Sequence, residues 1–155
     1  MRVRRNYLYD INTDSLITNI RSCKPMPYQS YGGISTTWRY DSQVALITYN
    51  DRWAPRDACL VSVNGAQINV YNQIQRDARA YLANRDINFL KNKNNLVVDF
   101  FRNDYLLRMT NNRLTVLATV YTPKSRVYSQ SLLMNYRYQV IGTLIEFHLV
   151  DIQRT

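Results

Sequence analysis

The sequence predicts an α+β fold dominated by β-structure, either an antiparallel sheet or a β-sandwich-like meander, with one main helix at about residues 70–84. The chain contains only four Lys and one Glu, the residue types that normally cover exposed helix surfaces. Tyr, Thr, Val and Ile, which favour strands, are plentiful, and Asn, which favours turns, is abundant. At 155 residues, the chain suits one domain spanning residues 1–155.

The N-terminal segment "RVRRNYLYD", residues 2–10, overlaps a stretch, residues 3–11, that can form a strand. Alternation along this strand places Tyr7 and Tyr9 on the same face. Because neither face is cleanly apolar, residues 1–10 are also candidates for an extended basic arm that docks on a neighbouring chain. A turn at "INTDS" follows, and residues 15–21, "SLITNIR", fit either a strand or a short helix.

Two loops and two strands are expected next. Residues 23–34, "CKPMPYQSYGGI", are the best loop candidate, because they hold two Pro and two of the chain's four Gly. Residues 50–57, "NDRWAPRD", form a second loop candidate. Between these loops, "STTWRY" and "QVALITY" are expected to be strands separated by a turn at "DS".

A hairpin and the main helix follow directly. Asn64-Gly65 stands between two apolar runs and predicts a two-residue type I′ turn, in which both residues need positive φ. The apolar period then changes from strand to helix, which predicts the helix at residues 70–84. The residues at helical spacing are Tyr71, Ile74, Ala78, Tyr81 and Leu82.

The C-terminal half predicts a β-meander after a polar connection at residues 91–95, "KNKNN". Its successive strands are expected at "LVVDFF", "YLLRMT", "RLTVLATVYT" and "RVYSQSLL", with turns at "RND", "NN" and "PKS". In the third of these strands apolar and polar residues alternate, which is typical of a half-buried antiparallel sheet. Residues 136–152 form one long strand or two, with an interruption or a bulge near Gly142.

Cys23 and Cys59 are the only cysteines, and we expect two free, partly buried thiols in a reducing compartment, with one disulfide as the alternative. No apolar run is long enough to span a membrane, and no classical secretory signal is present. The expected location is therefore the virion if the protein is viral, and otherwise the cytoplasm.

The charge of the chain favours an acidic partner. The formal net charge is +9, and sixteen of the twenty cationic residues are Arg. Arg favours planar, bidentate or stacked contacts, which suit both phosphate groups and protein interfaces. The acidic partner can therefore be nucleic acid, another polyanionic surface or an acidic patch on a neighbouring subunit.

Catalytic chemistry has weak support in the sequence. His148 is the only histidine, and it shares a strand face with Glu146, so the two can form a general-base pair. The simpler interpretation is a polar sheet edge. Asp99 and Asp104 can contribute to a carboxylate metal site, but aspartates are routine in turns. No nucleotide-binding or nucleophile motif occurs, so we expect no enzyme, cofactor, metal or small-molecule substrate.

These observations leave three functional hypotheses. The first is a non-enzymatic assembly protein, such as a capsid, capsid-associated or tail protein of a virus or phage, which contacts itself or other subunits through Tyr and Arg. The second is a small basic nucleic-acid-binding protein, and the third is an enzyme that uses Glu146, His148 or an aspartate pair. The residues expected at an interface or at nucleic acid are Arg2, Arg4, Arg5, Tyr7, Tyr9, Arg76, Arg79, Lys91 and Lys93.

Overall fold

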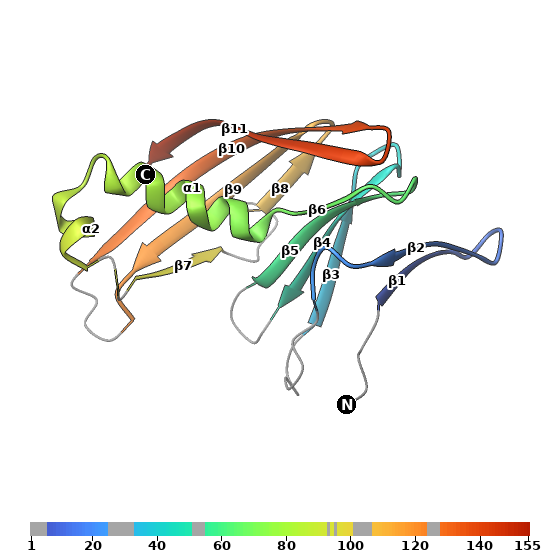
Figure 1. The fold of residues 1–155 in the computed structure, drawn as a ribbon, viewed down its shortest axis with the longest axis horizontal. Helices are drawn as coiled ribbons and strands as arrows, with labels where there is room; N and C mark the ends of the chain where they lie inside the picture. The colour runs from blue at the N-terminus through green and yellow to red at the C-terminus, as the bar shows by residue number, and fades with distance from the viewer. Residues whose placement is uncertain are drawn as a thin grey trace.

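The protein is built mostly of antiparallel β-structure, as the sequence predicts. The computed structural model describes residues 6–24, 33–50, 55–92, 94, 96–100, 107–123 and 128–155, and for residues 100 and 107 the backbone only. These residues form a two-stranded, a four-stranded and a five-stranded sheet, together with two helices (Figure 1). We call the three sheets the N-terminal hairpin, the central sheet and the large sheet.

The central sheet is buried on both faces at its middle strands. All seven residues of β4 and most of β5 are inaccessible to solvent. Such two-sided burial requires apolar residues at consecutive positions, which is why "VALI" and "ACLV" do not alternate with polar residues. The strands of this sheet are β3 (Gly33–Trp38), β4 (Val44–Asn50), β5 (Pro55–Ser62) and β6 (Gln67–Asn69), in that spatial order.

The turn between β5 and β6 confirms the predicted hairpin but corrects its type. The N–H of Gly65 donates to the carbonyl of Ser62 at 2.9 Å, so the turn is centred on Val63 and Asn64. Gly65 has a φ of 91°, whereas Asn64 is not among the described residues with positive φ, so the type I′ prediction is wrong. The side-chain oxygen of Asn64 instead accepts the N–H of Ala66 at 3.1 Å, as asparagine commonly does in turns.

The large sheet has the order β11-β10-β9-β7, with β8 also paired to β9. Its strands are β7 (Val97–Phe100), β8 (Leu107–Thr110), β9 (Arg113–Tyr121), β10 (Ser129–Ile141) and β11 (Leu144–Arg154). The predicted meander is correct from β8 onward and wrong before it. Strands β7 and β8 do not pair with each other, because both lie along the same edge of β9 at different heights.

The C-terminal stretch forms two strands that meet in a tight turn at Gly142. Ile141 pairs with Leu144, so Gly142 and Thr143 form a two-residue turn, and Gly142 has a φ of 56°. A positive φ at the first of two turn residues is the pattern of a type II′ hairpin. The irregularity expected near Gly142 is thus a chain reversal, and the bulge in this pair lies instead at Asn135 and Tyr136.

Both helices cover the same face of the large sheet (Figure 1). Helix α1 (Tyr71–Ala83) confirms the predicted helix, and its buried residues are Tyr71, Ile74, Ala78 and Leu82. Tyr81, which was expected to be buried, packs only partly against the core. Helix α2 (Ile87–Asn92) was not predicted, and it includes the start of the expected polar connection.

Asp86 fixes the start of α2 and ties it to the large sheet. One carboxylate oxygen accepts the N–H groups of Asn88 and Phe89, which caps the helix. The other oxygen accepts the hydroxyl of Tyr128 at 3.1 Å and the guanidinium of Arg154 at 2.7 Å. Burial acts to raise the pKa of Asp86, but these hydrogen bonds and the charge of Arg154 keep that pKa below its ordinary value.

The main core lies between the large sheet, helix α1 and one face of the central sheet. It includes Leu46 and Leu60 from the central sheet, Ile74 from α1, and Leu132 and Tyr136 from the large sheet. Burial and the nearby carboxylate of Asp77 raise the pKa of Tyr136, so its hydroxyl stays protonated and donates to Asp77 at 3.1 Å. This bond fastens α1 to β10.

The N-terminal hairpin lies on the other face of the central sheet. It consists of β1 (Asn6–Asp10) and β2 (Ser15–Ile20), so the ambiguous residues 15–21 are mainly a strand. Leu8 and Ile20 pack against a second, smaller core. The fully buried members of that core are Cys23, Ala45, Ile47, Tyr49, Cys59 and Val61.

We expect Ala78→Asp to lower the free energy of unfolding by about 3 kcal/mol, because Ala78 is fully buried and the new carboxylate would have no partner. Ala80→Asp is the matched control, since Ala80 is exposed on the same helix. Urea denaturation followed by circular dichroism measures both changes. Equal stabilities of the two variants would show that α1 does not bury this face.

Asp86 should contribute stability above its unfolded pKa that is lost as the pH falls through its lower folded pKa. We therefore expect Asp86→Asn to melt at a lower temperature than the wild type at neutral pH. The difference between the two proteins should shrink as the pH falls below about 4. Melting temperatures measured over a pH series test this, and a difference that does not change with pH would contradict it.

Candidate interaction surface

Exposed apolar side chains gather in the N-terminal half of the molecule. Thirteen large hydrophobic residues are exposed in the described part of the chain, and seven of them lie on the N-terminal hairpin, on β3 or directly after β3. Exposed apolar patches of this kind mark interaction sites. We call these seven residues the N-terminal surface: Tyr7, Tyr9, Ile11, Leu16, Ile34, Trp38 and Tyr40.

The hairpin contributes its outward face to this surface. Strand β1 alternates between half-buried and exposed residues, so that Leu8 faces the second core while Tyr7 and Tyr9 point outward. Tyr9 pairs with Leu16 of β2, which places both side chains on the outward face. The hydroxyl of Tyr9 also donates to Asp14 at 3.0 Å, which holds the end of the hairpin together.

Strand β3 contributes a strip that the hairpin leaves uncovered. Ile34 pairs with Tyr49 and Trp38 pairs with Ala45, so these side chains share the face that the second core occupies on β4. Tyr49 and Ala45 are buried under the hairpin, but Ile34 is 55% and Trp38 40% exposed. This face is therefore buried on β4 and β5 but remains exposed at these two positions of β3.

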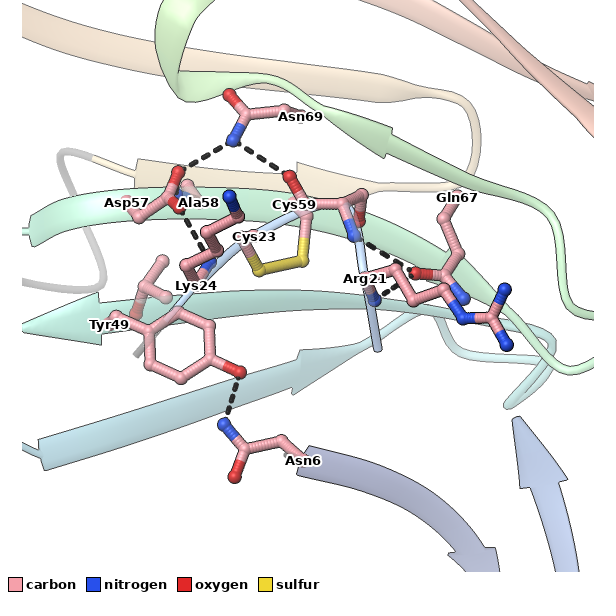
Figure 2. Close-up of a disulfide and its surroundings, with 12 residues drawn as sticks. Asn6, Arg21, Cys23, Lys24, Tyr49, Asp57, Ala58, Cys59, Gln67 and Asn69 are labelled. Atoms are coloured by element: carbon pink, nitrogen blue, oxygen red, sulfur yellow. Dashed lines mark hydrogen bonds between the residues drawn. A yellow bond between two sulfur atoms is a disulfide. The ribbon is translucent and has the colours of Figure 1, made fainter. Parts of the chain in front are cut away.

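A disulfide fastens the segment after the N-terminal hairpin to the central sheet. Cys23 follows β2 and is bonded to Cys59 of β5, with a Cα–Cα distance of 5.7 Å (Figure 2). The expectation of two free thiols is wrong, because the segment after β2 turns back over β5 and places Cys23 within the second core. Asn6 of β1 adds a hydrogen bond from its side chain to the hydroxyl of Tyr49 at 2.6 Å.

Three polar side chains bind the backbone of the same segment (Figure 2). The side-chain oxygen of Gln67 accepts the N–H groups of Arg21 and Ser22. Asp57 accepts the N–H of Lys24 at 2.8 Å. Asn69 donates both to the carbonyl of Ser22 at 2.9 Å and to Asp57 at 2.7 Å. Residues 21–24 are not part of a strand, so these side chains satisfy their backbone groups and hold the segment in place.

Two of the predicted interface residues, Tyr7 and Tyr9, belong to the N-terminal surface. Arg2, Arg4, Arg5 and Lys93 lie outside the described residues. Arg76 and Arg79 lie on α1 and Lys91 on α2, at the opposite end of the molecule from the hairpin (Figure 1). Arg79 donates to the carbonyl of Leu96 at 2.8 Å, which is a structural contact. The predicted residues that are described are thus not brought together into one site.

Sequence reasoning overlooked the apolar members of the surface on β3. A signal for them exists in "ISTTWRY", where Ile34, Trp38 and Tyr40 occupy alternate positions with Thr36. The strand was predicted, but which of its faces stays uncovered depends on where the hairpin ends, and that is a property of the tertiary structure.

The described residues that could perform chemistry are exposed or already bonded. His148 Nε2 lies 3.6 Å from Glu146 Oε2 on β11, with the two side chains 70% and 53% exposed. Asp99 accepts bonds from Arg56 and Tyr121, and Asp104 lies outside the described residues. An open cleft between the hairpin turns is lined by Thr18, Arg21, Gly65, Gln67 and Thr143, all uncharged except Arg21.

Two other kinds of site are not found among the described residues. No group of three or more His, Cys, Asp or Glu residues in the described ranges lies close enough to hold a metal ion. Neither of the described helices has the length and apolar character that a membrane span requires.

Comparison with known proteins gives no match. No family model fits the chain, and no curated protein or solved structure is detectably similar to it. The function of the protein must therefore be inferred from its own surfaces.

We expect loss of the disulfide to destabilise the protein by about 4 kcal/mol, because the bond closes a loop with a sequence separation of 36. Thermal denaturation with and without a reductant measures this, and a fall in melting temperature of about 10 °C is expected. The Cys23→Ala/Cys59→Ala variant should already melt at the lower temperature and should not respond to the reductant. A wild-type protein that is indifferent to the reductant would contradict the prediction.

Proposed function

We propose that this protein is a non-enzymatic assembly subunit that associates with further copies of itself through the N-terminal surface. The observation that carries the proposal is the concentration of exposed tyrosine, tryptophan and isoleucine side chains on the hairpin and on β3. Tyr and Trp are enriched at the centres of protein interfaces, where they bury large areas at little entropic cost. The disulfide and the surrounding hydrogen bonds hold this surface in place before association.

Two free strand edges support the same function. Within the described residues β1 pairs only with β2, and β3 is the outer strand of the central sheet. Unpaired backbone groups at such edges favour the addition of a strand from another chain.

A virion component, such as a capsid, capsid-associated or tail protein, is the kind of assembly that we propose. The support is compositional: a β-rich chain with many Tyr residues and far more Arg than Lys suits extensive subunit contacts. The exposed Glu146–His148 pair supports the non-enzymatic proposal, because it lies on an open strand and not in a cleft that excludes water.

We expect Tyr7→Ser/Ile34→Ser to weaken self-association by about tenfold or more, because both side chains are exposed members of the N-terminal surface. Ile87→Ser/Leu144→Ser is the matched control: these side chains are 69% and 68% exposed but lie on α2 and β11. Analytical ultracentrifugation over a range of concentrations measures the association constant of each protein. A wild type that is monomeric at all concentrations, or a control that is equally weakened, would overturn the proposal.

The role of the N-terminal arginines can be separated from that of the tyrosines. Replacing Arg2, Arg4 and Arg5 lowers the formal charge from +9 to +6, since 9 − 3 = 6. We expect this change to affect self-association less than Tyr7→Ala/Tyr9→Ala does, because the tyrosines provide the apolar area. The same ultracentrifugation measurement compares them, and a larger effect of the arginines would indicate docking on an acidic surface.

A further inference from the structure

The large sheet has a second face, which we call the outer face, opposite to the helices. The outward residues of β9 and β10 are half-buried or exposed, and none is fully buried. The two described helices lie on the other face (Figure 1). An antiparallel sheet commonly buries one face and leaves the other to solvent or to a partner, and on this five-stranded sheet the described elements leave the outer face open.

The register of the strands places three arginines and His148 near one another on this face. Arg113 of β9 lies directly opposite Arg137 of β10, and Arg137 lies directly opposite His148 of β11. Arg108 of β8 is the diagonal neighbour of Arg113, because Thr110 is the residue directly opposite Arg113. Side chains in such pairs share a face, with Cβ atoms about 4.5–5.5 Å apart for direct neighbours and about 7–8 Å for diagonal ones.

The carboxylates of the same face already have partners. Glu146 lies 3.6 Å from His148 and is also the diagonal neighbour of Arg137, to which, in the described structure, it makes no ion pair. Asp151 accepts hydrogen bonds from Asn135 and Gln153. Asp99 is bonded to Arg56 and Tyr121. By contrast, Arg108, Arg113 and Arg137 are exposed and make no hydrogen bond or ion pair within the described part of the chain. The face therefore presents three unpaired guanidinium groups.

The direct pairing of two arginines is unfavourable for the folded protein alone. Like charges directly opposite each other on neighbouring strands destabilise a sheet. An anion placed between Arg113 and Arg137 would remove this repulsion and would accept bidentate hydrogen bonds from planar guanidinium groups. We propose that the outer face binds the phosphate backbone of a single-stranded nucleic acid through Arg108, Arg113 and Arg137.

The shape of the face favours a single strand over a duplex. Four neighbouring strands, β8 to β11, extend about 14 Å at a spacing of about 4.8 Å, which is wider than the major groove of about 12 Å. A sheet of this width is too broad to enter that groove. A single strand can adjust the positions of its phosphates to the arginines, and its unstacked bases can stack on guanidinium planes. Because no base edge is read, binding should depend little on sequence.

This proposal does not depend on self-association. The N-terminal surface lies on the hairpin and on β3, whereas the proposed site lies on the large sheet. Tyr7→Ser/Ile34→Ser should therefore bind nucleic acid as the wild type does when compared at equal low protein concentration.

The test compares two double variants that carry the same charge. Arg113→Gln/Arg137→Gln removes the opposed pair, and Arg21→Gln/Lys24→Gln removes two exposed cationic residues elsewhere; each lowers the formal charge from +9 to +7, since 9 − 2 = 7. Fluorescence anisotropy with a labelled oligothymidine of about 20 nucleotides measures the dissociation constant at several salt concentrations, and a duplex of the same length competes.

We expect the first variant to raise the dissociation constant for the oligothymidine at least about tenfold at low salt. The slope of log K against log[salt] should become shallower by about 0.7 for each lost phosphate contact. The control variant should stay within about threefold of the wild type. Equal losses in both variants, no binding by the wild type, or tighter binding of the duplex would each overturn the proposal.

A stability measurement tests the same arrangement without a ligand. Arg137→Gln removes the repulsion between Arg113 and Arg137, so its melting temperature at low ionic strength should be about 1–4 °C above that of the wild type. The gain should shrink at high salt, because salt screens exposed charges. A lower melting temperature would show that Arg137 makes a stabilising contact, which would contradict the unpaired arginines on which the proposal depends.

Discussion

The burial of β4 and β5 on both faces is the constraint on which the rest of the structure depends. Leu46 and Leu60 face the main core, while Ile47 and Cys59 face the second core. Two strands with apolar side chains on both faces need a covering layer on each side. With a layer on one side only, the other apolar face would remain in water. The large sheet with α1 must therefore cover one face, and the N-terminal hairpin must cover the other.

The position of the proposed interface follows from the partial covering of the face of the central sheet that carries the second core. Leu8, Ile20 and Cys23 pack over the second core on β4 and β5, while Ile34 and Trp38 of β3 stay exposed. The hairpin is also too small to be stable by itself, so its position depends on Cys23 and on the side chains of Gln67, Asn69 and Asp57. The contacts that hold the hairpin therefore also determine which apolar residues stay exposed.

Patterns among neighbouring residues predicted the helices and strands that such patterns specify by themselves. The helical period from Tyr71 to Leu82 predicted α1, and alternation predicted β9. Helix α2 was overlooked because six residues are too short to show a period, and its start depends on bonds to Asp86. The pairing of β7 and β8 with one edge of β9 and the bond between Cys23 and Cys59 depend on residues far apart in sequence, which no local pattern encodes. The row of Arg113, Arg137 and His148 requires the register of three strands, so its members appeared unrelated in the sequence.

The positions of the second-core residues along the chain determine when this core can form during synthesis. Its six buried residues lie between positions 23 and 61, and Leu8 and Ile20, which pack against it, come earlier still. Every side chain of this core has therefore been translated before α1 begins at Tyr71, whereas the main core needs residues as late as Phe147. During vectorial synthesis, the N-terminal unit can close while the C-terminal half is still emerging from the ribosome. Until the large sheet is synthesised, the opposite face of β4 and β5 stays exposed to solvent, and exposed apolar surface of this kind favours aggregation.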